Sequence, residues 1–98
     1  MPKEIIWSRM AEIDLTNVTE YLIHKWSPKI ANNFLDLVEE YSTQISYDPQ
    51  SYPMINKKLK VRKCVVTKHN SLYYQELDNR IEIIRLFDNR QDPKKLKF

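Results

Sequence analysis

The apolar positions along the chain first indicate a short strand and a long helix. Residues 4–7 carry three apolar residues in weak alternation, which predicts a first strand. Over residues 11–22 the apolar positions recur at steps of four, three and four, the spacing of one helix face. Ser8 is the candidate cap at the start of this helix, and Trp26 stands near its end.

A second helix and a loop are expected next. Ser27 and Pro28 interrupt the first helix and start another, because proline fits the first helical turn. Apolar residues mark one side of this helix over residues 31–45, and so short a link predicts that the two helices pack as an antiparallel hairpin. Residues 46–60 lack a period and contain two prolines, so we expect a loop that crosses from the helices to a sheet.

The rest of the chain predicts a three-stranded meander. Strands are expected over residues 61–67, 72–77 and 80–87, with a two-residue hairpin turn at 78–79 of a kind that tolerates positive φ. The order β-α-α-β-β-β then predicts an α+β fold. Its helical hairpin would pack on one face of a small, mainly antiparallel four-stranded sheet, and basic residues would rim the open opposite face.

Composition favours one soluble globular domain over residues 1–98. No apolar run approaches the roughly 18 residues that a membrane helix needs. The single cysteine, Cys64, cannot form an internal disulfide, so we expect a reducing, cytoplasmic location. The chain has no glycine, which excludes Gly-rich phosphate loops and dinucleotide fingerprints. His24, Cys64 and His69 lack ligand spacing, so neither a metal nor a cofactor is expected.

The formal net charge of +3 conceals a strong division of charge between the two halves of the chain. Residues 1–56 contain four Lys or Arg and eight Asp or Glu, a net of −4. Residues 57–98 contain twelve Lys or Arg and five Asp or Glu, a net of +7. A basic, strand-rich half beside an acidic, helical half predicts an anionic partner.

The densest basic run is Lys57, Lys58, Lys60, Arg62 and Lys63. In a strand, Lys58, Lys60 and Arg62 would project from one face. Such a row suits the backbone of RNA or DNA. The alternative is a solvated edge strand, on which lysines guard against aggregation between sheets.

Arg85 interrupts an otherwise apolar predicted strand. By alternation it shares a face with Ile83 and Phe87, among apolar neighbours where an unpaired charge would be costly. Its guanidinium could lie in a cleft and bind a phosphate or carboxylate. Alternatively it could form an ion pair with an Asp or Glu across the sheet. Arg90, after the strand, could add to such a site or pair with Asp88.

Several of these positions recur together in a known family. Residues 88–93 are the most specific piece, and the other matching positions are Ala11, Asp14, Leu15, Val18, Tyr21, Ala31, Phe34, Leu37, Pro49, Val61, Arg62, Tyr74, Ile83, Ile84, Arg85, Leu86 and Phe87. This ordered set, over nearly the whole chain, resembles the RelE/ParE superfamily of toxins from bacterial type II toxin–antitoxin modules, of the plasmid-stabilisation type.

The resemblance implies a growth-inhibiting toxin that a cognate antitoxin neutralises, with an acidic antitoxin segment over the basic face. The two proteins could form a hetero-oligomer. ParE-like members block DNA gyrase, whereas RelE-like members cut mRNA on the ribosome without a metal. For a nuclease, the implied catalytic residues are Lys58, Lys60, Arg62 and Arg90. For binding of the target or antitoxin, the implied residues are Lys57, Lys58, Lys60, Arg62, Arg85 and Arg90.

Three positions depart from the nuclease pattern. Ser71 stands where an arginine is expected, Asp88 where many relatives have histidine, and Leu96 near an expected tyrosine. Arg85 with its apolar neighbours favours the ParE side. The first hypothesis is therefore a ParE-like inhibitor of gyrase. The alternative is a RelE-like, metal-independent endoribonuclease, and the third is a non-toxic basic domain that binds nucleic acid or protein.

Overall fold

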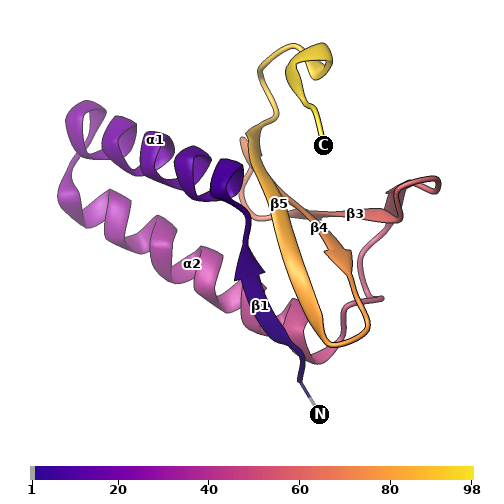
Figure 1. Cartoon of the computed structure of the whole chain (residues 1–98). Coiled ribbons are helices and arrows are strands. Elements are labelled where there is room, and N and C mark those ends of the chain that lie inside the picture. Colours follow the sequence, from indigo (N-terminus) through magenta and orange to yellow (C-terminus); the bar gives the residue numbers. More distant parts are fainter. Residues whose placement is uncertain (1) are drawn as a thin grey trace.

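The chain folds as a helical hairpin packed on one face of a five-stranded sheet (Figure 1). This computed structural model describes residues 2–98. The elements are β1 (Glu4–Trp7), α1 (Arg9–Lys25), α2 (Pro28–Tyr47), β2 (Met54–Asn56), β3 (Val61–Val65), β4 (Asn70–Glu76), β5 (Arg80–Asp88) and a 3₁₀ turn (Pro93–Lys95). The strand order is β1-β5-β4-β3-β2, with β1 parallel to β5 and the other pairs antiparallel. The predicted α+β class is confirmed, with five strands in place of four.

Both helices begin, and α1 ends, at the residues that the sequence marks. The Ser8 hydroxyl accepts a hydrogen bond from the Ala11 N–H at 3.1 Å, so it caps α1. Trp26 is the C-terminal cap of α1. Ser27 then caps α2 as Ser8 caps α1, and Pro28 occupies the first turn of α2. The antiparallel hairpin follows because almost no chain separates the two helices. Among residues 2–98, no helix is long and apolar enough to cross a membrane.

The sheet buries apolar side chains on both faces. The helix-side core consists of Ala11, Phe34, Val38, Ile45, Cys64, Val66, Leu72, Tyr74, Ile81, Ile83 and Leu86. The outer cluster, on the opposite face, consists of Val61, Tyr73 and Phe87, with Ile84 and Leu96 packed against it.

The C-terminal tail covers part of the outer face. Leu96 packs on the outer cluster, and the Phe98 ring lies 5.6 Å from the Tyr73 ring between centroids. The prediction of an open outer face is therefore wrong. The tail turns back because a free outer cluster would leave Tyr73 and Phe87 in water. Burial raises the pKa of Tyr73, as expected for a covered ring.

Residues 46–60 are more ordered than the predicted loop. The α2 helix continues to Tyr47, and Met54–Asn56 forms the short edge strand β2 beside β3. The Pro53 carbonyl accepts the Lys63 N–H at 3.0 Å, which starts this pairing. Three residues are too few to show a period of two, so sequence alternation could not reveal β2.

A bulge in β5 reverses the expected alternation. Tyr73 pairs with Arg85, whereas Tyr74 pairs with Ile83, so Ile84 is an extra residue on β5. Ile83 therefore points into the helix-side core, while Phe87 points into the outer cluster. The prediction that Arg85 shares a face with both of them is wrong because of this one inserted residue.

The hairpin turn between β4 and β5 forms where the sequence predicts it. The Leu77 N–H donates to the Arg80 carbonyl at 2.8 Å across residues 78–79. Both turn residues keep negative φ, and among residues 2–98 only Lys60 has a positive φ, of 58°. The left-handed position of this fold thus lies in the turn before β3.

Candidate functional site

The predicted row of basic side chains does not form on a strand. Lys57, Lys58 and Lys60 are all exposed and lie in the turn between β2 and β3, because β3 begins only at Val61. Strand alternation therefore does not apply to them, and the expected shared face with Arg62 is wrong. The three lysines instead lie in the turn that joins the edge strand β2 to β3.

Side chains from neighbouring elements hold this turn in place. The Asn56 side-chain carbonyl accepts the Leu59 N–H at 2.9 Å. The Gln75 amide, from β4, donates to the Leu59 carbonyl at 2.7 Å. Lys60 adopts its left-handed conformation between these anchors and β3. The lysines thus project from a turn whose backbone is fixed.

Arg62 points toward the backbone of the α2–β2 connection. Its Nη1 donates to the Tyr52 carbonyl at 2.7 Å and to the Gln50 carbonyl at 3.3 Å. The residue is half-buried. Its guanidinium therefore fastens residues 50–52 to the sheet and is engaged in the folded chain.

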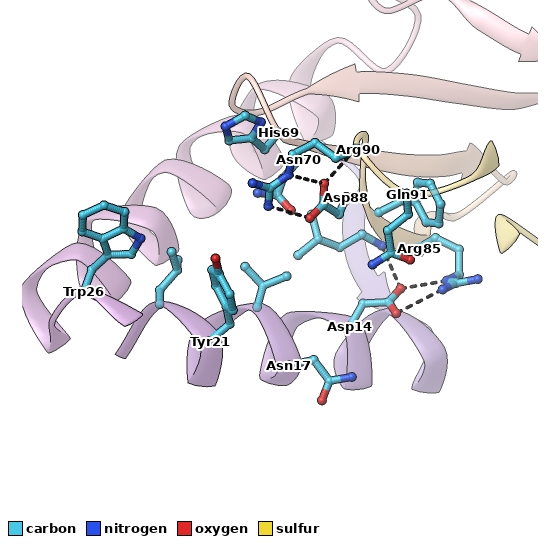
Figure 2. Close-up of a pocket in the computed structure, with 14 residues that line it drawn as sticks. Asp14, Asn17, Tyr21, Trp26, His69, Asn70, Arg85, Asp88, Arg90 and Gln91 are labelled. Atoms are coloured by element: carbon cyan, nitrogen blue, oxygen red, sulfur yellow. Dashed lines mark hydrogen bonds and ion pairs between the residues drawn. The ribbon is translucent and has the colours of Figure 1, made fainter. Parts of the chain in front are cut away.

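Arg85 forms the ion pair that the sequence left as one of two alternatives, but its partner comes from a helix. Its Nε donates to Asp14 Oδ2 at 2.7 Å and its Nη2 to Asp14 Oδ1 at 3.2 Å (Figure 2). The two side chains are 14% and 13% exposed. Asp14 lies in the first half of α1, so the pair joins α1 to β5 and does not cross the sheet.

The end of β1 explains why Asp14 is needed. Beyond Trp7 the chain leaves the sheet, with the Ser8 N–H donating to the Ile83 carbonyl at 2.9 Å. The next part of β5 pairs with β4 on one edge but has no strand on the edge that β1 occupies earlier. The Leu86 N–H there donates to Asp14 Oδ2 at 3.1 Å, so the carboxylate replaces the missing strand.

Arg85 also holds the C-terminal tail. Its Nη1 donates to the Lys97 carbonyl at 3.2 Å. One guanidinium thus connects α1, β5 and the tail, and all three of its nitrogens make hydrogen bonds within the chain.

Arg90 pairs with Asp88 just after β5. Its Nε and Nη2 donate to the two Asp88 carboxylate oxygens at 3.0 and 2.8 Å. Hydrogen bonding from Arg90 lowers the pKa of Asp88, and the same bonds raise the pKa of Arg90. Ser71, where the nuclease pattern has arginine, is fully buried and donates to the Asn89 side-chain carbonyl at 3.1 Å.

Arg85 and Arg90 line a pocket of about 560 Å³ between α1 and the end of β5 (Figure 2). Val18, Tyr21, Leu22 and Trp26 contribute the apolar side from α1. The polar side consists of Asp14, Asn17, His69, Asn70, Arg85, Asp88, Arg90 and Gln91, with Leu86 and Phe87 between the two. We call this the α1–β5 pocket. It brings together the predicted residues Arg85 and Arg90, while Lys57, Lys58, Lys60 and Arg62 lie outside its lining.

Sequence reasoning missed the aromatic side of the α1–β5 pocket. Tyr21 is 50% exposed and Trp26 is 67% exposed, although the sequence placed Trp26 only near the end of the first helix and named Tyr21 only as a family position. The sequence places both residues at the edge of the apolar stripe of α1. Their exposure becomes visible only when that stripe is placed against the sheet.

Residues 2–98 show neither a metal-binding cluster nor an activated cysteine. Among residues 2–98, no three His, Cys, Asp or Glu side chains gather as a metal site. Cys64 is buried, and burial raises the pKa of its thiol to about 11, so it is not an activated nucleophile. The α1–β5 pocket offers ion pairs and apolar surface, which suit binding better than bond cleavage.

Comparison with known proteins identifies the family. A family model described as "ParE toxin of type II toxin-antitoxin system, parDE" matches residues 5–93. No curated protein matches the chain.

Solved structures show the same fold. A chain of the chromosomal ParDE system from P. aeruginosa has a TM-score of 0.75 at 17% identity, covering 88% of this chain and 95% of that one. A chain of the RelBE2 toxin–antitoxin complex from Mycobacterium tuberculosis has a TM-score of 0.61 at 19% identity, with coverages of 91% and 100%. A chain of the E. coli DinJ–YafQ complex has a TM-score of 0.61 at 14% identity, with coverages of 90% and 93%. The protein therefore belongs to the ParE toxin family of type II toxin–antitoxin systems, within the RelE/ParE superfamily.

Proposed function

We propose that this protein is a growth-inhibiting toxin that blocks DNA gyrase, as the resemblance implies for ParE-like members. The observation that carries the proposal is the fate of the four residues that a RelE-like nuclease would use. Stabilising a phosphate in a transition state requires donors that converge on it and are free to bind it. Arg62 and Arg90 make their hydrogen bonds within the chain, and Lys58 and Lys60 lie in the turn before β3.

The match to the ParE family model favours the same conclusion. Ser71 adds to it, because a fully buried position bonded to Asn89 has no room for the arginine of the nuclease pattern. The RelE-like alternative would have to rearrange these contacts in its complex with the ribosome.

We further propose that a cognate antitoxin binds the turn between β2 and β3 with an acidic segment. Lys57, Lys58 and Lys60 are exposed there, and Ile55 and Leu59 are 45% and 43% exposed beside them. Opposite charges guide such a segment, and the apolar side chains give it something to cover. The binding surface is thus an edge of the sheet and not the outer face that the tail covers.

The test of the function has three parts. Induced expression in a bacterial host should lower colony counts, and co-expression of the adjoining partner gene should restore them. Purified protein should inhibit gyrase supercoiling and leave ribosome-bound mRNA intact. Cleaved mRNA with unaffected supercoiling would establish the nuclease alternative, and normal growth on induction would leave the non-toxic domain.

The antitoxin surface has a separate test. The triple variant Lys57→Glu, Lys58→Glu, Lys60→Glu should bind the partner protein at least tenfold more weakly and lose most of the salt dependence of binding. The matched control is Lys94→Glu with Lys95→Glu, which removes exposed lysines outside this turn. Equal loss in both variants would mean that only the net charge matters.

A further inference from the structure

We propose that the α1–β5 pocket is the surface with which the toxin holds its target protein. The occupant would be an acidic segment that places an apolar side chain between Tyr21 and Trp26. This inference rests on the proposed toxin function and assigns that function to a place on the molecule. The antitoxin surface proposed above lies elsewhere, since β2 and β3 are separated from β5 by β4.

The two aromatic side chains have the character of interface anchors. Trp26 is 67% exposed and Tyr21 is 50% exposed, and both line the pocket. Figure 2 shows both rings standing out from α1 on the side of the pocket that faces His69. Tryptophan and tyrosine are enriched among the residues that dominate protein–protein binding energy.

The backbone around Trp26 is fixed before any partner binds. The N–H groups of Trp26 and Ser27 both donate to the Leu22 carbonyl, at 2.9 and 3.1 Å. Ser27 in turn caps α2. An exposed ring on so constrained a junction loses little conformational freedom on binding, which favours affinity.

The charges around the pocket select an acidic partner. Inside it, Asp14 neutralises Arg85 and Asp88 neutralises Arg90. Around it, residues 21–35 contain no Asp or Glu, although the first half of the chain is acidic as a whole. The exposed basic residues near the pocket lining in sequence are His24, Lys25, Lys29 and Lys68. Glu20 and Asp92, next to the lining residues Tyr21 and Gln91, are exposed as well, so the rim carries both signs with an excess of lysine, while the ion pairs of the interior are balanced.

The lining favours a protein segment over a nucleic acid. Both arginines of the pocket are paired with carboxylates, which lowers the net positive charge that a phosphate would meet there. Val18, Leu22 and Leu86 extend the apolar surface between the aromatic rings and the sheet. A cavity of about 560 Å³ with this apolar and aromatic lining has room for an apolar side chain of a partner protein.

The test separates the target from the antitoxin. Trp26→Ala and the double variant Lys25→Glu, Lys68→Glu should each weaken growth arrest. Colony counts after induction should be at least tenfold higher than with the unchanged protein. Both should bind the partner antitoxin within twofold of the unchanged protein. Tyr47→Ala is the matched control, because Tyr47 is 70% exposed, lies at the end of α2 and does not line this pocket. Far-UV circular dichroism should show that every variant is folded.

Each other outcome overturns the inference. Full toxicity with lost antitoxin rescue would assign the pocket to the antitoxin. Full toxicity with full rescue would leave the pocket without a role in binding, and a variant that binds single-stranded RNA less tightly than the unchanged protein would assign it to nucleic acid. If the unchanged protein does not arrest growth, the proposed function itself fails, which the control arm without any substitution reveals directly.

Discussion

Removing the Asp14 carboxylate tests whether this side chain stabilises the edge of β5 beyond the end of β1. In Asp14→Ala, the Arg85 guanidinium loses two acceptors and the Leu86 N–H loses its carboxylate acceptor. Arg85 keeps just the Lys97 carbonyl of the tail. The substitution should therefore loosen α1, the end of β5 and the tail together.

The magnitude follows from the burial of the pair. Breaking a buried ion pair by removing one partner costs about 3–5 kcal/mol, and an unsatisfied buried N–H costs about 1–3 kcal/mol. Both side chains here are 13–14% exposed, so some water can reach them. These losses overlap, and we expect a total of about 3–4 kcal/mol. A domain of this length has a stability of roughly 5–15 kcal/mol, so the loss is a large share.

The assay is urea unfolding followed by far-UV circular dichroism, with the free energy of unfolding extrapolated to water. The melting temperature should fall by roughly 12–32 °C, given about 4–8 °C per kcal/mol in a domain of this size. Asp14→Asn retains an acceptor for the Leu86 N–H and should lose about half as much. Asp36→Ala, which removes an exposed aspartate from α2, should change stability by less than about 0.5 kcal/mol.

A double-mutant cycle identifies the pair itself. Arg85→Met keeps an unbranched apolar stem and removes the charge. Combined with Asp14→Asn, it should cost less than the two single changes together, with a coupling of about 0.5–3 kcal/mol. An Asp14→Ala loss below about 1 kcal/mol, or strict additivity in the cycle, would refute the structural role of this ion pair.

Three further predictions concern other buried or paired groups. Tyr74→Phe removes a 2.6 Å hydrogen bond to the Pro49 carbonyl and should cost about 1–2 kcal/mol in urea unfolding, whereas no change would mean that water replaces the bond. Lys3 lowers the pKa of Glu76, so this pair stabilises the fold above the unfolded-state pKa and less as pH falls through the folded-state pKa; Glu76→Gln should flatten that part of the stability–pH curve, measured between pH 2 and 6. Burial raises the pKa of Cys64 to about 11, so at pH 8 a thiol reagent should label it only on the timescale of unfolding, and rapid labelling of the native protein would contradict this.

Local rules in the sequence predicted most of the fold. Ser8, Ser27 and Pro28 fix where the helices start, and these signals act over only a few residues. The strands of the meander were recognisable because apolar and aromatic residues concentrate in them. The superfamily could also be recognised, since its matching positions are spread over nearly the whole chain and the family model confirms it.

Features that depend on distant contacts could not be predicted. The Ile84 bulge is set by pairing with β4, and one inserted residue reverses every later side chain of β5. Asp14 meets Arg85 across 71 positions of sequence, so no periodicity connects them. Lys58 and Lys60 alternate as a strand would, but the hydrogen bonds to Leu59 make that segment a turn. Local propensity has no information on any of these contacts.

The candidate site shows the same limit. An ion pair was one of the alternatives for both Arg85 and Arg90, and the structure shows that both form one, Arg90 with the expected Asp88 and Arg85 with Asp14 from α1. Tyr21 and Trp26 gained importance only when their exposure on the folded chain was known. Charge counted along a sequence therefore overstates the charge that a partner encounters.

Gyrase supercoiling, measured with purified protein beside a ribosome-bound mRNA cleavage assay, tests the proposed function most directly. We expect supercoiling to be inhibited in proportion to protein concentration, inhibition to be reversed by the partner antitoxin, and mRNA to stay intact. Full supercoiling at high protein concentration, with mRNA cut on the ribosome, would contradict the proposal and assign the protein to the nucleases of its superfamily.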